Sequence, residues 1–229
     1  MTQEEQGMLD AELLAAARLG DRAAVERLLA AGARVNAWVP REGNRPLHLA
    51  SAGGHADVVK LLLDGGADMH AVNAEKYTPL HVAASGGWPD VVKLLLEKGA
   101  RMNSRGSLME TPLHHAAVCG KMEAAVLLLE NGAGLHDADG MGNTPLHVAA
   151  ERGRNDLVEF LLCRAADPDR KNHAGKRPVD VADAYPETRE TLVEWERAGG
   201  LSGIRQAEIS AHLARQRKLG GLRRRGPSI

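Results

Sequence analysis

The chain has 229 residues, of which 44% are hydrophobic and only 3% aromatic, so we expect a core built mainly from Leu, Val and Ala. Its two cysteines, Cys119 and Cys163, are far apart in the sequence, which argues against a disulfide scaffold and fits a reducing compartment. The N-terminus carries Glu4, Glu5 and Asp10 without an apolar run, so we expect no secretory signal. No apolar run approaches the length of a membrane span.

The formal net charge of −1 hides an asymmetry along the chain. Residues 201–229 contain seven basic side chains against the single acidic residue Glu208, a local charge of +6, so the first 200 residues carry −7. An acidic body followed by a basic tail is the one strong charge signal of the sequence.

One tetrapeptide recurs at a fixed period. Thr144-Pro145-Leu146-His147 is matched by Thr111-Pro112-Leu113-His114 and Thr78-Pro79-Leu80-His81, with weaker copies beginning at Arg45 and Arg177. The copies begin at residues 45, 78, 111, 144 and 177, so every interval is 33 residues. A period of this length is typical of architectures in which supersecondary units stack on one another.

In chain order, residues 9–32 are predicted to form two short helices separated at Gly20-Asp21, with Asp21 as the N-cap of the second helix. The next repeat has the same layout, with helices over residues 47–52 and 58–63 and a break at Gly53-Gly54. Glycines that end the second helix recur along the chain. They are Gly32, Gly66, Gly99 and Gly132, and Ala165 takes this place in the fourth full copy.

Each repeat is therefore predicted to run as helix, tight turn, helix, glycine and loop. Helices of two or three turns are marginally stable alone, and each has an apolar stripe that only a neighbouring repeat covers. Small pairs such as Ala83-Ala84 and Ala116-Ala117 allow the first helices to approach closely, while bulkier Val and Leu residues of the second helices stack behind them. This unequal bulk predicts a curved array with the loop tips on its concave side.

Thr-Pro-Leu-His, followed by Ala-Ala, Gly, Val-x-x-Leu-Leu and Gly-Ala, resembles the ankyrin repeat from about Leu9 to Gly200. The resemblance implies an all-α solenoid of stacked helix-turn-helix units with β-turn loops, and a concave groove that binds other proteins. We expect a monomer. The expected segments are a degenerate N-terminal cap (1–39), four repeats (40–72, 73–105, 106–138 and 139–171), a degenerate C-terminal cap (172–200) and a basic tail (201–229) that is partly helical or disordered.

Two departures from the family pattern carry structural expectations. Lys76 and Met109 occupy the loop position that Gly142 and Gly175 hold in other copies, so a left-handed backbone there would carry a penalty. The last copy has Asp180 in place of the histidine and keeps an apolar face at Leu192, Val193 and Trp195, as expected of a terminal capping unit.

The histidines invite a metal or catalytic interpretation, but their spacing favours a structural one. His48, His81, His114 and His147 are the repeat histidine. Stacked helices lie about 8–10 Å apart, whereas ligands of one zinc ion each lie about 2 Å from the metal. We therefore expect each imidazole to hydrogen-bond within its own turn and to the neighbouring repeat, and we predict no metal and no cofactor.

No catalytic constellation is evident in the sequence. The glycines end helices rather than open a phosphate-binding loop. Cys119 lies four residues after His115, so a Cys–His nucleophile is a minor hypothesis, but no orienting group or oxyanion site accompanies it. We therefore predict that the chain is not an enzyme.

The loop tips provide the stronger functional candidates. Aromatic, Leu and Met residues along a concave ridge would anchor a partner protein, because such residues are enriched at interface cores. The alternative is scattered surface exposure without function. The first hypothesis is thus an adaptor, scaffold or inhibitor whose protein-binding residues are Tyr77, Trp88, Leu108, Met109, Met141, Asn143, Glu75 and Arg41.

A second hypothesis places the function in the basic tail, with the solenoid as its regulator. The tail is interpreted as a solvated end, a nuclear-import signal, or a basic helix for an acidic partner, nucleic acid or a membrane surface. Nucleic acid is disfavoured because the tail has no aromatic residue for base stacking. We predict a cytoplasmic protein, or a nuclear one if the tail acts in import. The basic cluster is Arg215, Arg217, Lys218, Arg223, Arg224 and Arg225.

Overall fold

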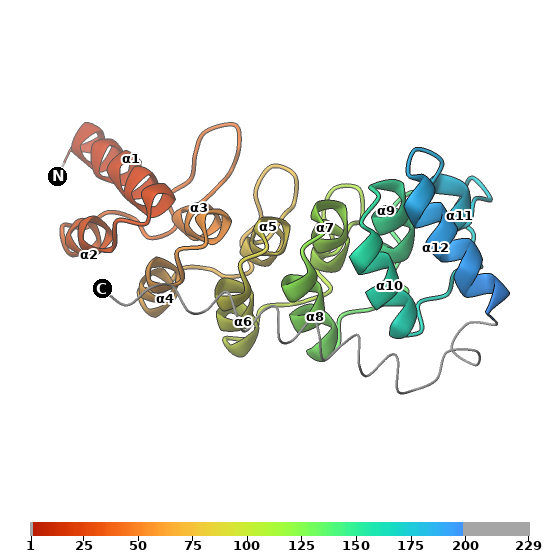
Figure 1. Cartoon of the computed structure of the whole chain (residues 1–229). Coiled ribbons are helices and arrows are strands. Elements are labelled where there is room, and N and C mark those ends of the chain that lie inside the picture. The colour runs from red at the N-terminus through yellow and green to blue at the C-terminus, as the bar shows by residue number, and fades with distance from the viewer. Residues whose placement is uncertain (1, 199–229) are drawn as a thin grey trace, which may run out of the picture. The chain divides into compact units, whose positions relative to one another are not determined.

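The computed structural model describes residues 2–198, which contain helices, turns and loops and no β-strand (Figure 1). The chain divides into two compact blocks, Met1–Gly140 and Met141–Ile229. The N-terminal block contains α1 (Gln3–Leu19), α2 (Arg22–Ala30), α3 (Pro46–Gly53), α4 (Ala56–Asp64), α5 (Pro79–Gly86), α6 (Pro89–Glu97), α7 (Pro112–Cys119) and α8 (Met122–Glu130). The C-terminal block contains α9 (Pro145–Glu151), α10 (Asn155–Cys163), α11 (Pro178–Val181) and α12 (Pro186–Arg197).

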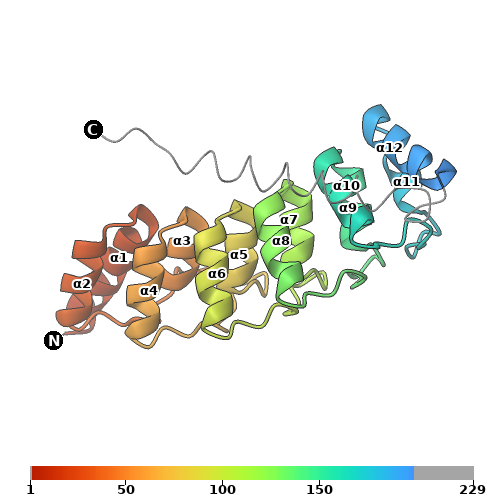
Figure 2. The same cartoon turned by 60° about the horizontal axis from the view of Figure 1, so that its bottom comes forward.

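Helices of the N-terminal block form two layers (Figures 1 and 2). The first helix of each repeat packs on the first helix of the next, in the order α1, α3, α5, α7, and the second helices α2, α4, α6 and α8 stack in the same way. Each first helix also packs on its own second helix. This confirms the predicted architecture of stacked helix pairs. Among the described residues, no helix combines the length and hydrophobicity that a membrane crossing requires.

The first helices begin where the repeated proline predicts. Pro46, Pro79 and Pro112 each occupy the first turn of their helix, where a missing N–H removes no hydrogen bond. The turn that follows each helix is left-handed, at Gly54, Gly87 and Gly120. The repeated leucine behind each proline is fully buried, and transferring one such side chain from water contributes roughly 1.5–3 kcal/mol.

The N-terminal helix is longer than the sequence prediction. We expected two short helices over residues 9–32, whereas α1 already begins at Gln3. The reason is a capping box at Thr2: the Glu5 amide donates to the threonine hydroxyl (3.1 Å), and the Thr2 amide donates to the Glu5 carboxylate (2.7 Å). The following helix behaves as predicted, because the Asp21 carboxylate accepts a hydrogen bond from the Ala24 amide at 3.0 Å.

An ion pair ties the long first helix to the loop behind α2. The Asp10 carboxylate is buried and accepts hydrogen bonds from the Arg34 amide (2.8 Å), the Arg34 Nε (2.7 Å) and the Gln6 side chain (2.9 Å). Burial raises the pKa of Asp10, but the hydrogen bonds from Arg34 and Gln6 outweigh it and leave the pKa below its usual value.

The C-terminal block repeats the pairing with shorter elements. Helix α9 packs on α11, and α10 packs on α12. Asp180 takes the place of the repeat histidine, and its carboxylate accepts a hydrogen bond from the Arg177 amide at 2.9 Å. Leu192 is fully buried while Glu194 and Glu196 on the same helix are exposed, so α12 has one packed and one solvated face, as expected of a cap. The predictions for the basic tail lie outside the described residues.

Candidate functional site

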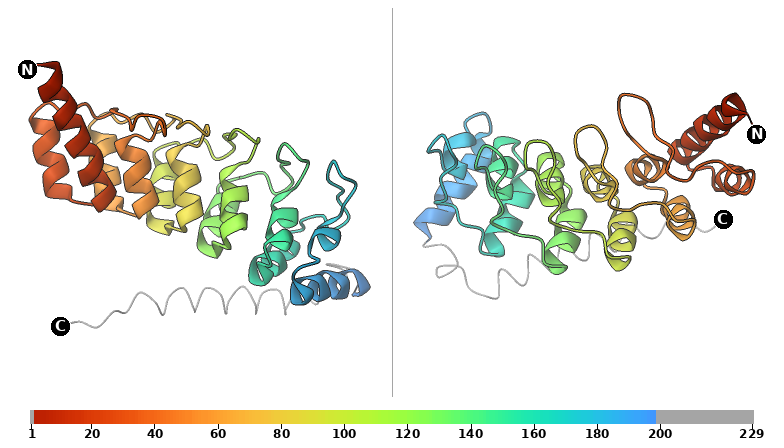
Figure 3. Two further views of the ribbon diagram at one scale, coloured as in Figure 1. Left: turned by 90° about the horizontal axis from the view of Figure 1, so that it is seen from above. Right: turned by 180° about the vertical axis from the view of Figure 1, so that it is seen from behind.

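The loops between repeats form a row of projecting turns in the N-terminal block, seen in Figure 3. We call residues 39–44, 73–77 and 106–110 the finger loops. Main-chain hydrogen bonds join their tips in sequence: the Ala74 amide donates to the Glu42 carbonyl (2.9 Å), and the Ser107 amide donates to the Glu75 carbonyl (2.9 Å). The Gly140 amide continues the series to the Leu108 carbonyl at 2.7 Å. Each finger is thus held by its neighbour.

Each finger turns through a left-handed residue at an equivalent position. The φ angles are +69° at Gly43, +60° at Lys76 and +64° at Met109. This confirms the expectation that Lys76 and Met109 stand where other copies carry glycine. A side chain in this conformation costs about 1–2 kcal/mol, which the hydrogen bonds around the turn offset.

Side chains lock the third finger from both ends. The Arg105 guanidinium donates to the Met109 carbonyl (2.9 Å) and to the Ala138 carbonyl (2.6 Å), and it pairs with Asp137 at 3.4 Å. The Glu110 carboxylate accepts a hydrogen bond from the Leu108 amide at 2.9 Å. In the second finger, the Asn73 side-chain oxygen accepts hydrogen bonds from the amides of Glu75 and Tyr77.

The third finger presents two large apolar side chains to solvent. Leu108 is 68% exposed and Met109 is 49% exposed. The neighbouring tips carry exposed charged residues, among them Glu75 on the second finger and Arg41 on the first. Of the eight predicted binding residues, only Arg41, Glu75 and this apolar pair lie on the finger tips of the N-terminal block, and the other four do not.

Tyr77 supports the fingers from inside rather than extending the row of tips. Its half-buried ring lies 4.4 Å from the His115 ring centroid and 5.5 Å from that of His81. The Tyr77 hydroxyl donates to the Glu110 carboxylate at 3.2 Å, which links the second finger to the third. Burial, followed by the charge of Glu110, raises the pKa of the Tyr77 phenol.

Trp88 lies at the opposite end of α5 from Tyr77 and is not part of the finger loops. Helix α5 separates Tyr77 from Trp88, and its eight residues span about 12 Å. The Trp88 indole donates to the Ala52 carbonyl at 2.7 Å, and a Cβ on Gly54 would overlap its ring. Trp88 thus packs on the turn of the preceding repeat while 40% of its surface stays exposed.

The position of Trp88 belongs to a second periodic feature, whose contacts sequence reasoning did not predict. The residue before each second helix leans back over the glycine turn of the preceding repeat. His55 covers Gly20, Trp88 covers Gly54, and Lys121 covers Gly87. The signal was present in the sequence, because these residues directly follow a glycine and recur at intervals of 33.

Met141 and Asn143 belong to the C-terminal block and are not part of the N-terminal finger row. Met141 is 68% exposed, and its carbonyl accepts a hydrogen bond from the His173 amide at 3.0 Å. The Asn143 side chain accepts a hydrogen bond from the Asn172 amide group at 2.8 Å. Within that block, the same main-chain connection between successive loops is therefore repeated.

The repeat histidines have the structural role predicted for them. In His48 and His81, Nδ1 accepts a hydrogen bond from the backbone amide three residues earlier, at 3.3 and 3.1 Å. The Nε2 proton therefore points to the next finger, where the carbonyls of Tyr77 and Glu110 accept at 3.0 and 3.2 Å. Burial is the main cause that lowers the pKa of both imidazoles to about 4.

His115 and Cys119, the residues of the minor Cys–His hypothesis, each contact other side chains. The His115 ring lies against Tyr77 and His81, and burial lowers its pKa. The Cys119 thiol forms a hydrogen bond with the Ser85 hydroxyl at 3.3 Å. In residues 2–198, no three side chains of His, Cys, Asp or Glu are grouped in a way that could hold a metal ion.

Comparison with known families agrees with this geometry. A family model described as ankyrin repeats in three copies matches residues 13–106 and 102–172. A search of curated proteins found no match. Ankyrin repeats are generally protein–protein interaction modules and are typically non-catalytic. The chain therefore belongs to the ankyrin repeat family.

Proposed function

We propose that the chain is a non-enzymatic adaptor, scaffold or inhibitor that binds a partner protein through the finger tips of its N-terminal block. The observation that carries the proposal is the exposed apolar pair Leu108 and Met109 on a finger held by main-chain and side-chain hydrogen bonds. Apolar anchors surrounded by charged residues match the usual anatomy of an interface, with an apolar core and a polar rim.

The rigidity of the third finger favours binding. Ordering a mobile loop on association reduces affinity, and a loop that is already held in place avoids that loss. Arg105 and Glu110 fix the main chain on both sides of the apolar pair. Glu75 and Arg41 on the neighbouring tips would then contribute to partner choice through charge rather than through buried area.

The test exchanges the apolar pair for the residues of the neighbouring finger. In the variant Leu108→Glu/Met109→Lys, the third finger copies Glu75 and Lys76, whose backbone already adopts this turn. We expect affinity purification with mass spectrometry to lose the partner proteins captured by the unmodified chain. The matched control is Met8→Glu/Leu19→Lys, which removes two apolar side chains that are 61% and 77% exposed on α1.

Two outcomes would contradict the proposal. One is capture of the same partners by the finger variant, and the other is equal loss from the finger variant and the α1 control. A third arm, a chain ending at residue 200, addresses the alternative suggested by the +6 charge of residues 201–229. If partners disappear with the tail but persist in the finger variant, the function resides in the tail.

A further inference from the structure

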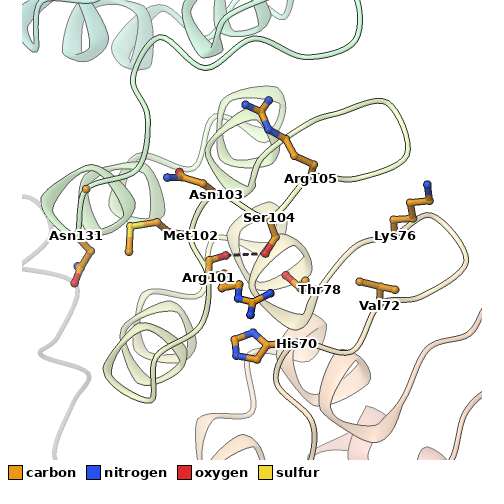
Figure 4. A pocket seen from close by; sticks show the side chains of 11 residues that line it. His70, Val72, Lys76, Thr78, Arg101, Met102, Asn103, Ser104, Arg105 and Asn131 are labelled. Atoms are coloured by element: carbon orange, nitrogen blue, oxygen red, sulfur yellow. Dashed lines mark hydrogen bonds between the residues drawn. The ribbon is translucent and has the colours of Figure 1, made fainter.

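A surface pocket of about 790 Å³ lies on the loop side of the N-terminal block. Its walls come from three consecutive repeats: the segment before the second finger, the segment before the third finger, and the end of α8 (Figure 4). Its volume is in the range of sites that hold small molecules or several residues of a peptide. None of the predicted protein-binding residues lines it.

The charged residues that line the pocket are all basic, although the N-terminal block as a whole has a net negative charge. None of its eleven lining residues is Asp or Glu, whereas three are Lys76, Arg101 and Arg105. Arg105 is committed to Asp137 and to two carbonyls. Within residues 2–198, the Lys76 ammonium and the Arg101 guanidinium have no ion-pair or hydrogen-bond partner. Two cationic groups therefore remain available to a ligand.

Two asparagines on the pocket wall each have one side-chain group in use and one available. The Asn103 oxygen accepts a hydrogen bond from the Gly134 amide at 3.2 Å, which leaves its NH₂ group as a donor. The Asn131 NH₂ group donates to the Leu127 carbonyl at 2.8 Å, which leaves its oxygen as an acceptor. A donor and an acceptor together match the C=O and N–H of a peptide main chain.

The remaining walls supply apolar contact. Val72 is 48% exposed and lies on one side of the pocket, and the half-buried Met102 lies on the other (Figure 4). Methionine adapts to ligands of different shape because its side chain is unbranched and polarizable.

We propose that this pocket binds an acidic peptide segment of the partner protein. Carboxylates of the peptide pair with Lys76 and Arg101, its main chain bonds to Asn103 and Asn131, and an aliphatic side chain lies against Met102. This inference rests on the proposed function of the chain as a protein-binding module. A peptide is favoured over a nucleic acid because the Asn131 acceptor and the apolar wall have no counterpart on a phosphate backbone.

The experiment begins with a phage-displayed library of random peptides, panned against the full-length chain. The most enriched peptides are then synthesised with a fluorescent label, and their Kd is measured by anisotropy. The pocket variant is Lys76→Gln/Arg101→Gln. The matched control is Lys60→Gln/Lys93→Gln, which removes the same charge from exposed positions on the second helices α4 and α6. The finger variant Leu108→Glu/Met109→Lys and a labelled single-stranded oligothymidine complete the set.

We expect enriched peptides to carry several Asp or Glu residues and to bind the pocket variant at least about tenfold more weakly, a difference of about 1.4 kcal/mol. Binding to the helix control should change by less than about twofold. No enrichment, enrichment without acidic residues, or unchanged binding to the pocket variant would overturn the inference. So would oligothymidine that binds more tightly than the peptides and depends on the same two residues.

The panel also separates the inference from the proposed function. If the peptides lose affinity for the finger variant alone, the pocket inference fails while the proposed finger surface stands. If they lose affinity for the pocket variant alone, the inference stands independently of Leu108 and Met109.

Discussion

At the scale of single residues, Ala165 shows how the repeat constrains the backbone. Gly32, Gly66, Gly99 and Gly132 all have positive φ after a second helix, and Ala165 adopts φ +67° at the equivalent place. The sequence period alone predicted this equivalence. A left-handed alanine is disfavoured by about 1–2 kcal/mol relative to glycine in the folded chain.

We therefore expect Ala165→Gly to raise the free energy of unfolding by about 0.5–1 kcal/mol, because the more flexible unfolded chain offsets part of the relief. Urea unfolding followed by circular dichroism measures the change. Ala11→Gly, at an exposed position inside α1, is the control and should lower stability by about 1 kcal/mol. A decrease at both positions would show that the left-handed strain at Ala165 is negligible.

Ser51 carries a different kind of local penalty. Its hydroxyl oxygen is buried and has no hydrogen-bond partner among the described residues. The equivalent positions in the following repeats are Ala84, Ala117 and Ala150, all fully buried. An unsatisfied buried polar group costs about 1–3 kcal/mol.

We expect Ser51→Ala to stabilise the chain by about 1 kcal/mol in the same unfolding measurement, since it removes the unpaired group without changing the backbone. Ser85→Ala serves as the comparison, because the Ser85 hydroxyl has a partner in the Cys119 thiol. The interpretation fails if Ser51→Ala lowers stability as much as Ser85→Ala does.

At the scale of elements, the repeat histidines connect each first helix to the finger that follows it. For His48 and His81 the folded pKa of about 4 lies below the ordinary value of 6.5, because burial disfavours the charged imidazole. Between these values the unfolded chain binds more protons than the folded chain. The contribution of the neutral imidazoles to the free energy of unfolding is therefore complete above pH 6.5 and is lost as the pH falls through about 4.

We expect the free energy of unfolding to fall between pH 7 and pH 5, with His48 and His81 each contributing on the order of 2 kcal/mol. Urea unfolding at a series of pH values measures this slope. His48→Gln retains a donor and an acceptor but does not titrate, so it should reduce the slope. A slope that is unchanged in His48→Gln would assign the pH dependence to other groups.

Element boundaries show where sequence reasoning succeeds. The proline at the start of each first helix and the glycine behind each helix act within a few residues, so both were predictable from local pattern. The start of α1 was missed although Thr2 and Glu5 form a recognisable capping box. The separation of Tyr77 from Trp88 was not predicted. The two residues are close in sequence because only the short helix α5 lies between them, but that helix places them at opposite edges of the stacked repeats.

At the scale of the whole molecule, the period of 33 residues was sufficient to predict the fold class, because stacking identical units leaves few alternatives. The candidate sites were less predictable. Lys76 and Arg101 occupy different positions within their repeats, so no motif joins them, and only the stacking of neighbouring loops brings both to one pocket. The first 200 residues carry a net charge of −7, so a local cationic pocket among them could not be predicted from net charge.

The hydrogen bonds between finger tips have a consequence for how such a protein changes over generations. They run from main-chain amides to main-chain carbonyls, at Ala74 and Glu42, Ser107 and Glu75, and Gly140 and Leu108. Because no side chain takes part, substitutions at Glu42, Glu75 or Leu108 leave the connection intact. Mutations at the tips can therefore change which partner is recognised. The backbone positions of the fingers stay the same, because main-chain hydrogen bonds fix them.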